Sequence, residues 1–126
     1  SYTVVGRAKD MVISGGENIY PAEIEHLLAS HPLVADCAVL GLPDAQWGEK
    51  LVAVVVLKHQ NGTIPASNGQ ETLSNWESVL SEFLGGRIAR YKLPRRWVCV
   101  DALPRTALGK VQKAVLARQL GPDAAA

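Results

Sequence analysis

The sequence has few of the residues that build metal sites and disulfide frameworks. Its 126 residues include two cysteines, Cys37 and Cys99, and three histidines. The histidines are scattered and no Cys/His cluster is visible, so the sequence does not support a zinc site. The cysteines lie far apart within apolar segments. We therefore predict two buried free thiols in a reducing compartment, with a disulfide as the alternative.

An excess of charge of one sign and a long apolar run are also missing. Thirteen Lys and Arg residues stand against twelve Asp and Glu residues, which leaves a net charge of +1. This balance argues against binding of nucleic acid through an overall positive charge, although it allows a local basic patch. The longest uninterrupted apolar run, residues 51–57, is too short to span a bilayer. Because no secretory signal is visible either, we expect a cytoplasmic protein with no membrane span.

The residues that are present suffice for one compact domain with a core of its own. Hydrophobic residues make up 48% of the chain and charged residues 20%, which is ordinary for a globular protein. We predict an α+β fold, in which a short N-terminal β-hairpin precedes a small, mainly three-stranded core sheet flanked by about three helices. The predicted strands cover residues 2–5, 11–13, 34–42, 50–58 and 96–101, and the predicted helices cover residues 21–31, 73–84 and 111–120.

Two of these elements have clear patterns. Residues 50–58 are continuously rather than alternately apolar, which predicts a strand covered on both faces. Residues 73–84 carry apolar side chains at helical spacing, which predicts one buried helix face. We predict loops over residues 14–18, 59–70 and 103–110, and a short helical turn over residues 87–91.

Three of the segments between core elements carry residue types that chemistry uses. Around Gly15 and Gly16, exposed backbone N–H groups could let an elongated ligand pass close to the chain. The alternative is a plain turn between a hairpin and a helix.

Residues 87–96 hold five basic side chains near two aromatic ones. They could bind nucleic acid or a small polyphosphate, or they could extend their aliphatic stems over an apolar strand.

The third loop, residues 104–110, ends in a lysine that directly follows a glycine. Lys110 is a mobile cation that could reach a phosphate group, or it could be a solvated surface lysine. A nucleotide phosphate loop requires Gly, four residues and then Gly-Lys-Ser/Thr. Val111 follows Lys110 and no glycine stands at position 104, so this segment is not such a loop.

Taken in order, these loops resemble the C-terminal domain of the adenylate-forming superfamily, which holds acyl- and aryl-CoA synthetases, peptide-synthetase adenylation domains and beetle luciferases. The matching segments are residues 6–25 (GRAKDMVISGGENIYPAEIE), 41–44 (GLPD), 47–49 (WGE), 91–94 (YKLP) and 103–110 (LPRTALGK). Each segment is weak evidence alone, but together they cover nearly the whole chain in the right order and spacing. The version at residues 14–21, SGGENIYP, looks most like bacterial acyl-CoA or benzoate-type CoA ligases.

The resemblance implies a two-step reaction. A carboxylate attacks the α-phosphate of ATP to give acyl-AMP and pyrophosphate, and the thiol of coenzyme A then displaces AMP. A large N-terminal domain binds the acid, the ATP and its Mg²⁺, and the small C-terminal domain rotates on a hinge between the steps. We expect residues 1–122 to form this small domain and residues 123–126 a frayed tail. The large domain lies outside this chain, so we expect the isolated chain to be inactive.

The resemblance also implies roles for individual residues. Lys110 corresponds to the catalytic lysine of adenylation, whose ammonium bridges the attacking carboxylate and the α-phosphate. Arg7 corresponds to an arginine near the AMP ribose, and Lys9 to the hinge position, which the family fills with Asp or Lys.

Five further positions are implied to meet coenzyme A after the rotation: Gly15, Gly16, Glu17, Trp47 and Arg95. The first three match the loop that lines the pantetheine tunnel. Trp47 matches an aromatic residue that contacts CoA in aryl-CoA ligases, and Arg95 lies in a basic stretch that could meet the CoA phosphates.

Two other functions fit the same residues. In a peptide synthetase, a carrier protein would bring the pantetheine, but the basic stretch over residues 87–96 favours free CoA with its phosphorylated nucleotide end. The chain could also be a stand-alone module that binds nucleotide or RNA, in which case RNA binding would be tight and steeply salt-dependent.

Overall fold

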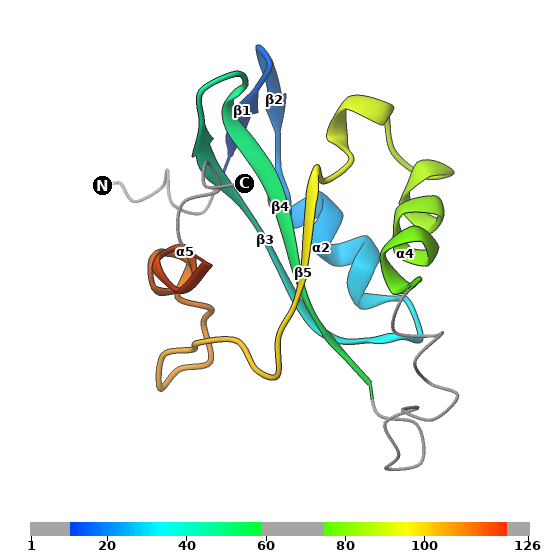
Figure 1. Cartoon of the computed structure of the whole chain (residues 1–126). Helices are drawn as coiled ribbons and strands as arrows, with labels where there is room; N and C mark the ends of the chain where they lie inside the picture. Colours follow the sequence, from blue (N-terminus) through cyan, green and yellow to red (C-terminus); the bar gives the residue numbers. More distant parts are fainter. Residues whose placement is uncertain (1–10, 59–74, 121–126) are drawn as a thin grey trace.

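The computed structural model describes residues 11–58 and 75–120. These residues form five strands in two sheets, three α-helices and one turn of 3₁₀ helix (Figure 1). The elements are β1 (Val12–Ser14), β2 (Glu17–Ile19), α2 (Pro21–Ala29), β3 (Val34–Asp44), β4 (Gly48–Leu57), α4 (Trp76–Gly85), η1 (Arg90–Lys92), β5 (Arg96–Cys99) and α5 (Lys113–Leu120). The predicted α+β fold, with a hairpin, a three-stranded sheet and three helices, is confirmed.

The larger sheet has the strand order β3-β4-β5, so β4 is its central strand. β3 pairs antiparallel with β4, and β5 pairs parallel with it. Residues 51–55 of β4 are all buried, each with at most 1% of its surface exposed. The continuous apolar run therefore forms a strand covered on both faces, as predicted.

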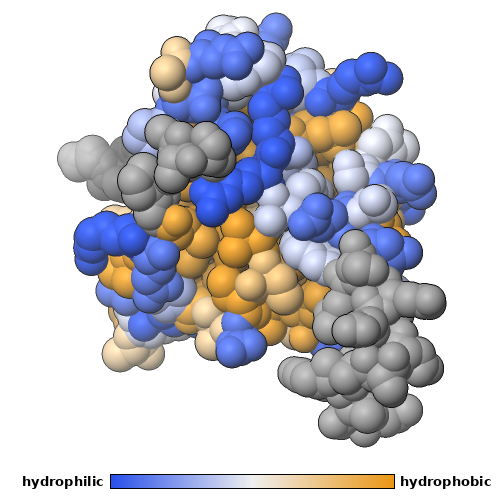
Figure 2. Space-filling model, viewed as in Figure 1, coloured by the Kyte–Doolittle hydropathy of each residue, from blue (hydrophilic) through white to orange (hydrophobic). Residues whose placement is uncertain are grey.

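Helices cover the two faces of this sheet unequally (Figure 1). On one face, α2 and α4 pack over alternate residues of β4, whereas α5 packs on the other face. The first core contains Ile24, Leu28, Leu51, Ala53, Val55, Leu80 and Leu84, and the second contains Ala38, Leu40, Val52, Val54, Leu103 and Leu116. Hydrophobic residues gather over the middle of the sheet between α5 and β5 (Figure 2), where partly buried valines border the second core.

The β1–β2 hairpin packs against the end of the larger sheet where β3 turns into β4. A Cβ atom at Gly41 of β3 would lie 2.9 Å from Val12 Cγ1, so the hairpin approaches the sheet more closely than any side chain would permit. The backbone N–H of Ile13 also donates a hydrogen bond of 2.9 Å to Glu49 Oε1 at the start of β4. The hairpin is therefore held to the sheet by both packing and a hydrogen bond.

The second strand of the hairpin corrects one prediction. We expected a loop over residues 14–18, but Glu17–Ile19 forms a strand and pairs with Val12–Ser14. The reason is the turn between them, in which Gly15 has φ +59° and Gly16 has φ +84°. Positive φ at both central residues is the pattern of a tight two-residue hairpin turn, so the chain reverses directly. The first predicted strand, residues 2–5, lies outside the described residues.

The cysteine prediction is correct in part. Both thiols are free, and Cys37 is half-buried, but Cys99 is exposed. Cys99 ends β5, which is an edge strand, and the other residues of that strand are only half-buried. The apolar run around Cys99 thus lies at the margin of the core. Within residues 11–58 and 75–120, no helix combines the length and apolar composition needed to cross a membrane.

Candidate functional site

A tight turn joins β3 to β4 and supports the glycine pair of the hairpin. Asp44 Oδ2 accepts hydrogen bonds from the backbone N–H of Gln46 and of Trp47, at 3.0 and 2.8 Å. The carbonyl of Trp47 in turn accepts a 2.9 Å hydrogen bond from the N–H of Gly15. The Trp47 ring lies so close to Gly15 that a Cβ there would be 2.8 Å from Cε3. The indole ring therefore packs directly against the backbone of the Gly15–Gly16 turn and limits how closely this turn can approach the β3–β4 turn.

A third segment completes this surface. The guanidinium carbon of Arg95 lies 3.8 Å from the centroid of the Trp47 ring, which is the geometry of a cation–π contact. The backbone N–H of Arg95 donates to the carbonyl of Leu51 at 2.9 Å, which holds this segment beside β4. The structure thus brings together Gly15, Trp47 and Arg95, which are far apart in the sequence.

The remaining two predicted CoA-binding residues continue the same surface along the chain. Gly16 and Glu17 are both exposed. Among residues 11–58 and 75–120, no atom lies within 4 Å of the place where a Cβ of Gly16 would stand, so in this part of the chain the outer side of the turn is open. We call the surface formed by Gly15, Gly16, Glu17, Trp47 and Arg95 the hairpin surface.

Lys110 lies elsewhere, in an exposed loop between β5 and α5 that we call the lysine loop (residues 104–112). Its base is closed by a bridge between Arg105 and Val111. Inside it, the hydroxyl oxygen of Thr106 accepts hydrogen bonds from the N–H groups of Leu108 and Lys110, both at 3.2 Å. Gly109 has φ +93°, a conformation that favours glycine and lets the chain turn just before the lysine.

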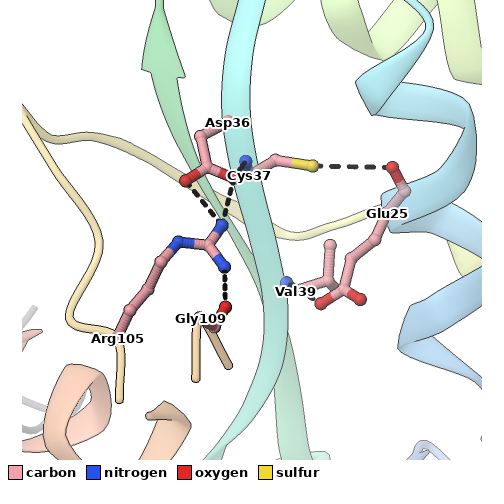
Figure 3. A network of polar contacts seen from close by, with 6 residues as sticks. All are labelled: Glu25, Asp36, Cys37, Val39, Arg105 and Gly109. Atoms are coloured by element: carbon pink, nitrogen blue, oxygen red, sulfur yellow. Dashed lines mark hydrogen bonds and ion pairs between the residues drawn. The ribbon is translucent and has the colours of Figure 1, made fainter. Parts of the chain in front are cut away.

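An ion pair that we did not predict ties the lysine loop to β3 (Figure 3). The Nη2 atom of Arg105 lies 2.6 and 2.7 Å from the two carboxylate oxygens of Asp36. The Nη1 atom of the same side chain donates to the carbonyl of Gly109. Arg105 belongs to the motif that we recognised, but Asp36 lies 69 residues away, and no feature of the sequence pairs them.

A second carboxylate lies at the edge of β3 that faces away from β4 (Figure 3). Glu25 of α2 accepts a 2.8 Å hydrogen bond from the N–H of Val39 and forms a 2.9 Å ion pair with Lys113 of α5. The thiol of Cys37 donates to the backbone carbonyl of Glu25. Side chains from both sheet faces thus meet at this edge and occupy backbone groups that another strand could pair with.

The same edge lowers the reactivity of Cys37. Burial, followed by the nearby charges of Glu25 and Asp36, raises the pKa of the Cys37 thiol to about 12. A thiol with this pKa is neutral at physiological pH, whereas the thiolate is the form that attacks electrophiles and binds metals. Cys37 is therefore a structural residue.

The hairpin surface and the lysine loop lie at opposite ends of β3 (Figure 1). The lysine loop is anchored at Asp36 near the start of this strand, and the hairpin surface adjoins the turn that follows Asp44. Eight residues of extended strand correspond to roughly 26 Å. The structure therefore groups the predicted CoA-binding residues but does not bring Lys110 to them. Arg7 and Lys9 lie outside the described residues.

Residues 23–110 match the family described as the AMP-binding enzyme C-terminal domain. The chain belongs to this family. It is 53% identical over 110 residues to an indoleacetate–CoA ligase of Aromatoleum aromaticum, an alignment that covers 87% of this chain and 19% of that protein. It is 44% identical over 113 residues to a long-chain-fatty-acid–CoA ligase of Mycobacterium tuberculosis, covering 90% of this chain and 20% of that protein.

Solved structures agree with this assignment. A fatty acyl CoA synthetase of Mycobacterium tuberculosis superimposes with a TM-score of 0.71 at 44% identity, over 87% of this chain and 19% of that one. An acyl-CoA synthetase of Brucella canis gives a TM-score of 0.75 at 31% identity, over 90% of this chain and 19% of that one. This domain spans about a fifth of the length of the relatives that it matches.

Proposed function

We propose that this domain is the mobile C-terminal part of an AMP-forming acid–CoA ligase. In such an enzyme a carboxylic acid displaces pyrophosphate from ATP to give acyl-AMP, and the CoA thiol then displaces AMP to give the thioester. The family assignment and the names of the relatives support this class of reaction. The observation that carries the proposal is the placement of two chemically different surfaces at opposite ends of one strand.

In the first step, Lys110 supplies positive charge. Its ammonium would lie between the attacking carboxylate and the α-phosphate and stabilise the negative charge that develops there. Two features of the lysine loop suit this role. Lys110 is exposed, so its side chain can enter a site on another domain, and Thr106 holds its backbone. Arg7 would contact the AMP ribose, while the large N-terminal domain would hold most of the ATP with its Mg²⁺.

In the second step, the hairpin surface faces coenzyme A. The open side of the Gly15–Gly16 turn would let the narrow pantetheine arm pass close to the backbone, with Glu17 beside it. Arg95, held over Trp47, places a positive charge where a CoA phosphate would meet it. The indole would thereby support the turn and orient the guanidinium at the same time.

The separation of the two surfaces requires a movement. Because they lie roughly 26 Å apart along a paired strand, one reaction centre on a second domain can meet only one of them at a time. The small domain must therefore turn between the two half-reactions, and Lys9 would be the hinge residue that absorbs the change in backbone dihedral angles.

A peptide synthetase, in which a carrier protein brings the pantetheine, is the second candidate. Arg95 on Trp47 favours free CoA, because only CoA carries the phosphorylated nucleotide end. The two can be separated by comparing CoA with pantetheine, which lacks those phosphates. For a CoA ligase, we expect Arg95→Ala to raise the KM for CoA and to leave the KM for pantetheine unchanged.

The experiment that tests this proposal uses the complete enzyme, which joins this domain to the large domain. It measures ATP–pyrophosphate exchange that depends on a carboxylic acid substrate, and it measures thioester formation. Aromatic and aliphatic acids should both be tried, since the relatives include an indoleacetate ligase and a fatty-acid ligase. We expect exchange with at least one acid, followed by CoA-dependent thioester formation. The 126-residue chain alone should do neither, and turnover by it would contradict the proposal.

A further inference from the structure

We propose that Arg105 is a positioning residue for Lys110, acting through the contact of its Nη2 atom with both carboxylate oxygens of Asp36 and through the hydrogen bond from Nη1 to Gly109. This inference rests on the proposed role of Lys110 in adenylation. It adds that the position of the Lys110 ammonium relative to the sheet depends on one guanidinium, which joins the lysine loop to the edge strand β3.

The geometry of the contact suits a clamp (Figure 3). One nitrogen of the guanidinium, Nη2, lies 2.6 and 2.7 Å from the two oxygens of Asp36. The other, Nη1, donates to the carbonyl of Gly109, the residue directly before Lys110. Because the guanidinium is planar and rigid, its two nitrogens stay at a fixed separation, with one on Asp36 and the other on Gly109. The backbone at Gly109 is thereby placed relative to β3.

The anchor end of the clamp is held firmly. Asp36 lies on β3 and pairs with Val56 of β4. Its Oδ1 atom also accepts a 2.9 Å hydrogen bond from the N–H of Cys37. The neighbouring stretch of the same edge is tied to α2 and α5 through Glu25. A carboxylate placed in this way gives Arg105 a fixed reference point.

At the other end of the clamp, hydrogen bonds join residues of the lysine loop to one another. Thr106 donates its N–H to the carbonyl of Lys110 at 2.8 Å, and Gly109 donates to the carbonyl of Thr106 at 2.9 Å. These bonds keep the shape of the loop, and Val111 packs its C-terminal end against the second core. Arg105 ties the part of the loop beside Lys110 to β3. Without it, the loop could keep its internal turns and still carry the ammonium of Lys110 to a different position.

The ion pair is poorly suited to a purely stabilising role. The side chains of Arg105 and Asp36 are 39% and 33% exposed, and such surface pairs contribute little to folding. By contrast, displacement of a charge-stabilising group by about 1 Å slows a reaction on the order of 100-fold. The loss of Arg105 should therefore reduce one half-reaction far more than it reduces stability.

The test uses the complete enzyme with Arg105→Ala, Arg105→Lys and Asp36→Asn. The matched control is Glu23→Gln, which breaks another surface ion pair of this domain, Lys92 Nζ to Glu23 Oε1 at 3.1 Å, with side chains 23% and 43% exposed. Each variant is assayed for ATP–pyrophosphate exchange and, with pre-made acyl-AMP and CoA, for thioester formation. Urea unfolding of the same variants measures stability.

We expect Arg105→Ala to lower kcat of the exchange reaction on the order of 10- to 100-fold, with little change in the KM for ATP, and to spare thioester formation. Arg105→Lys keeps the charge but cannot hold both partners, so it should fall between wild type and Arg105→Ala. Asp36→Asn should act in the same direction, and its effect should largely disappear in the Arg105→Ala background. Glu23→Gln should resemble wild type.

Two outcomes would overturn the inference: exchange by Arg105→Ala at the rate of Glu23→Gln, or equal loss of both half-reactions. Lys110→Ala in the same assay separates this inference from the proposed function. If Lys110→Ala exchanges normally, the role of the lysine is wrong, whereas a slow Lys110→Ala with a normal Arg105→Ala removes only the clamp. ¹⁵N relaxation of the 126-residue chain gives a readout without catalysis. Arg105→Ala should lower the order parameters of the Gly109 and Lys110 amides, because the loop moves as a body, and should leave those of β4 unchanged.

Discussion

The indole of Trp47 lies directly against the backbone of Gly15. The N–H of Gly15 donates to the carbonyl of Trp47 at 2.9 Å, and a Cβ on Gly15 would stand 2.8 Å from a ring carbon. This contact joins the β1–β2 turn to the β3–β4 turn. The two glycines of the hairpin surface differ: Gly16 also has positive φ, but no atom of the described residues lies within 4 Å of where its Cβ would stand.

The difference between these glycines gives the first prediction. Alanine at either position must adopt a left-handed backbone, which costs about 1–2 kcal/mol. Gly15→Ala must in addition move the Trp47 ring. We therefore expect Gly15→Ala to lower the free energy of unfolding by clearly more than Gly16→Ala, as measured by urea unfolding of the 126-residue chain. Equal losses would show that the ring yields freely and does not fix the turn.

The second prediction concerns the contact between Trp47 and Arg95. If the indole orients the guanidinium toward CoA, Trp47→Ala and Arg95→Ala should each raise the KM for CoA in the thioester-forming step. The double variant should be little worse than the poorer single variant, because residues that act through one another do not add. Additive effects in this cycle would mean that the two side chains act independently. Lys50→Ala, a change at a lysine on β4, serves as the charge control.

The third prediction compares the two free thiols. Burial raises the pKa of Cys37 to about 12, and although burial also raises the pKa of Cys99, that residue is exposed. A thiol reagent at pH 8 should label Cys99 quickly and Cys37 only slowly. Cys99→Ser should remove the fast phase, and Cys37→Ser the slow one. Fast labelling that survives Cys99→Ser would show that the β3 edge opens readily.

The fourth prediction is a pH dependence at His31. Its Nδ1 atom accepts a 3.0 Å hydrogen bond from the N–H of Leu33, which requires an unprotonated nitrogen. Burial, then the charge of Arg87, lowers the pKa of His31 below its usual 6.5. The folded state therefore binds this proton less tightly than the unfolded state. The stabilisation is present above pH 6.5 and is lost as the pH falls below it.

Asparagine offers a neutral acceptor of similar reach, so His31→Asn is the matched variant. Between pH 7 and pH 5, the urea midpoint of the wild-type chain should fall further than that of His31→Asn. Parallel changes in the two proteins would assign the pH dependence to other groups.

The central strand and the helix faces could be predicted from the sequence because their signals are local. The apolar run at residues 51–55 specifies a strand buried on both faces. The spacing over residues 73–84 predicts a helix face, which is found in the described part of that range, from Trp76 on. The second hairpin strand was missed because a Gly-Gly pair flanked by polar residues suits a loop as well as a tight turn. Only the pairing of Glu17 with Ser14 distinguishes the two.

The site was predictable residue by residue but not as an arrangement. The motifs identified Trp47, Arg95 and Lys110, yet the stacking of Arg95 on Trp47 depends on β5 lying parallel beside β4. The clamp from Arg105 to Asp36 joins residues 69 positions apart, and a surface carboxylate on an edge strand has no local signature. Long-range contacts of this kind follow from the assembled sheet.

The most direct test of the two-surface mechanism assays two variants of the complete enzyme in each of the two half-reactions. Lys110→Ala removes the charge proposed for adenylation, and Trp47→Ala removes the support of the hairpin surface. The measurement is ATP–pyrophosphate exchange beside thioester formation from pre-made acyl-AMP and CoA. We expect Lys110→Ala to slow exchange by about 100- to 1000-fold and to spare thioester formation, and Trp47→Ala to give the opposite pattern. If either variant slowed both half-reactions equally, the two ends of β3 would not serve separate steps.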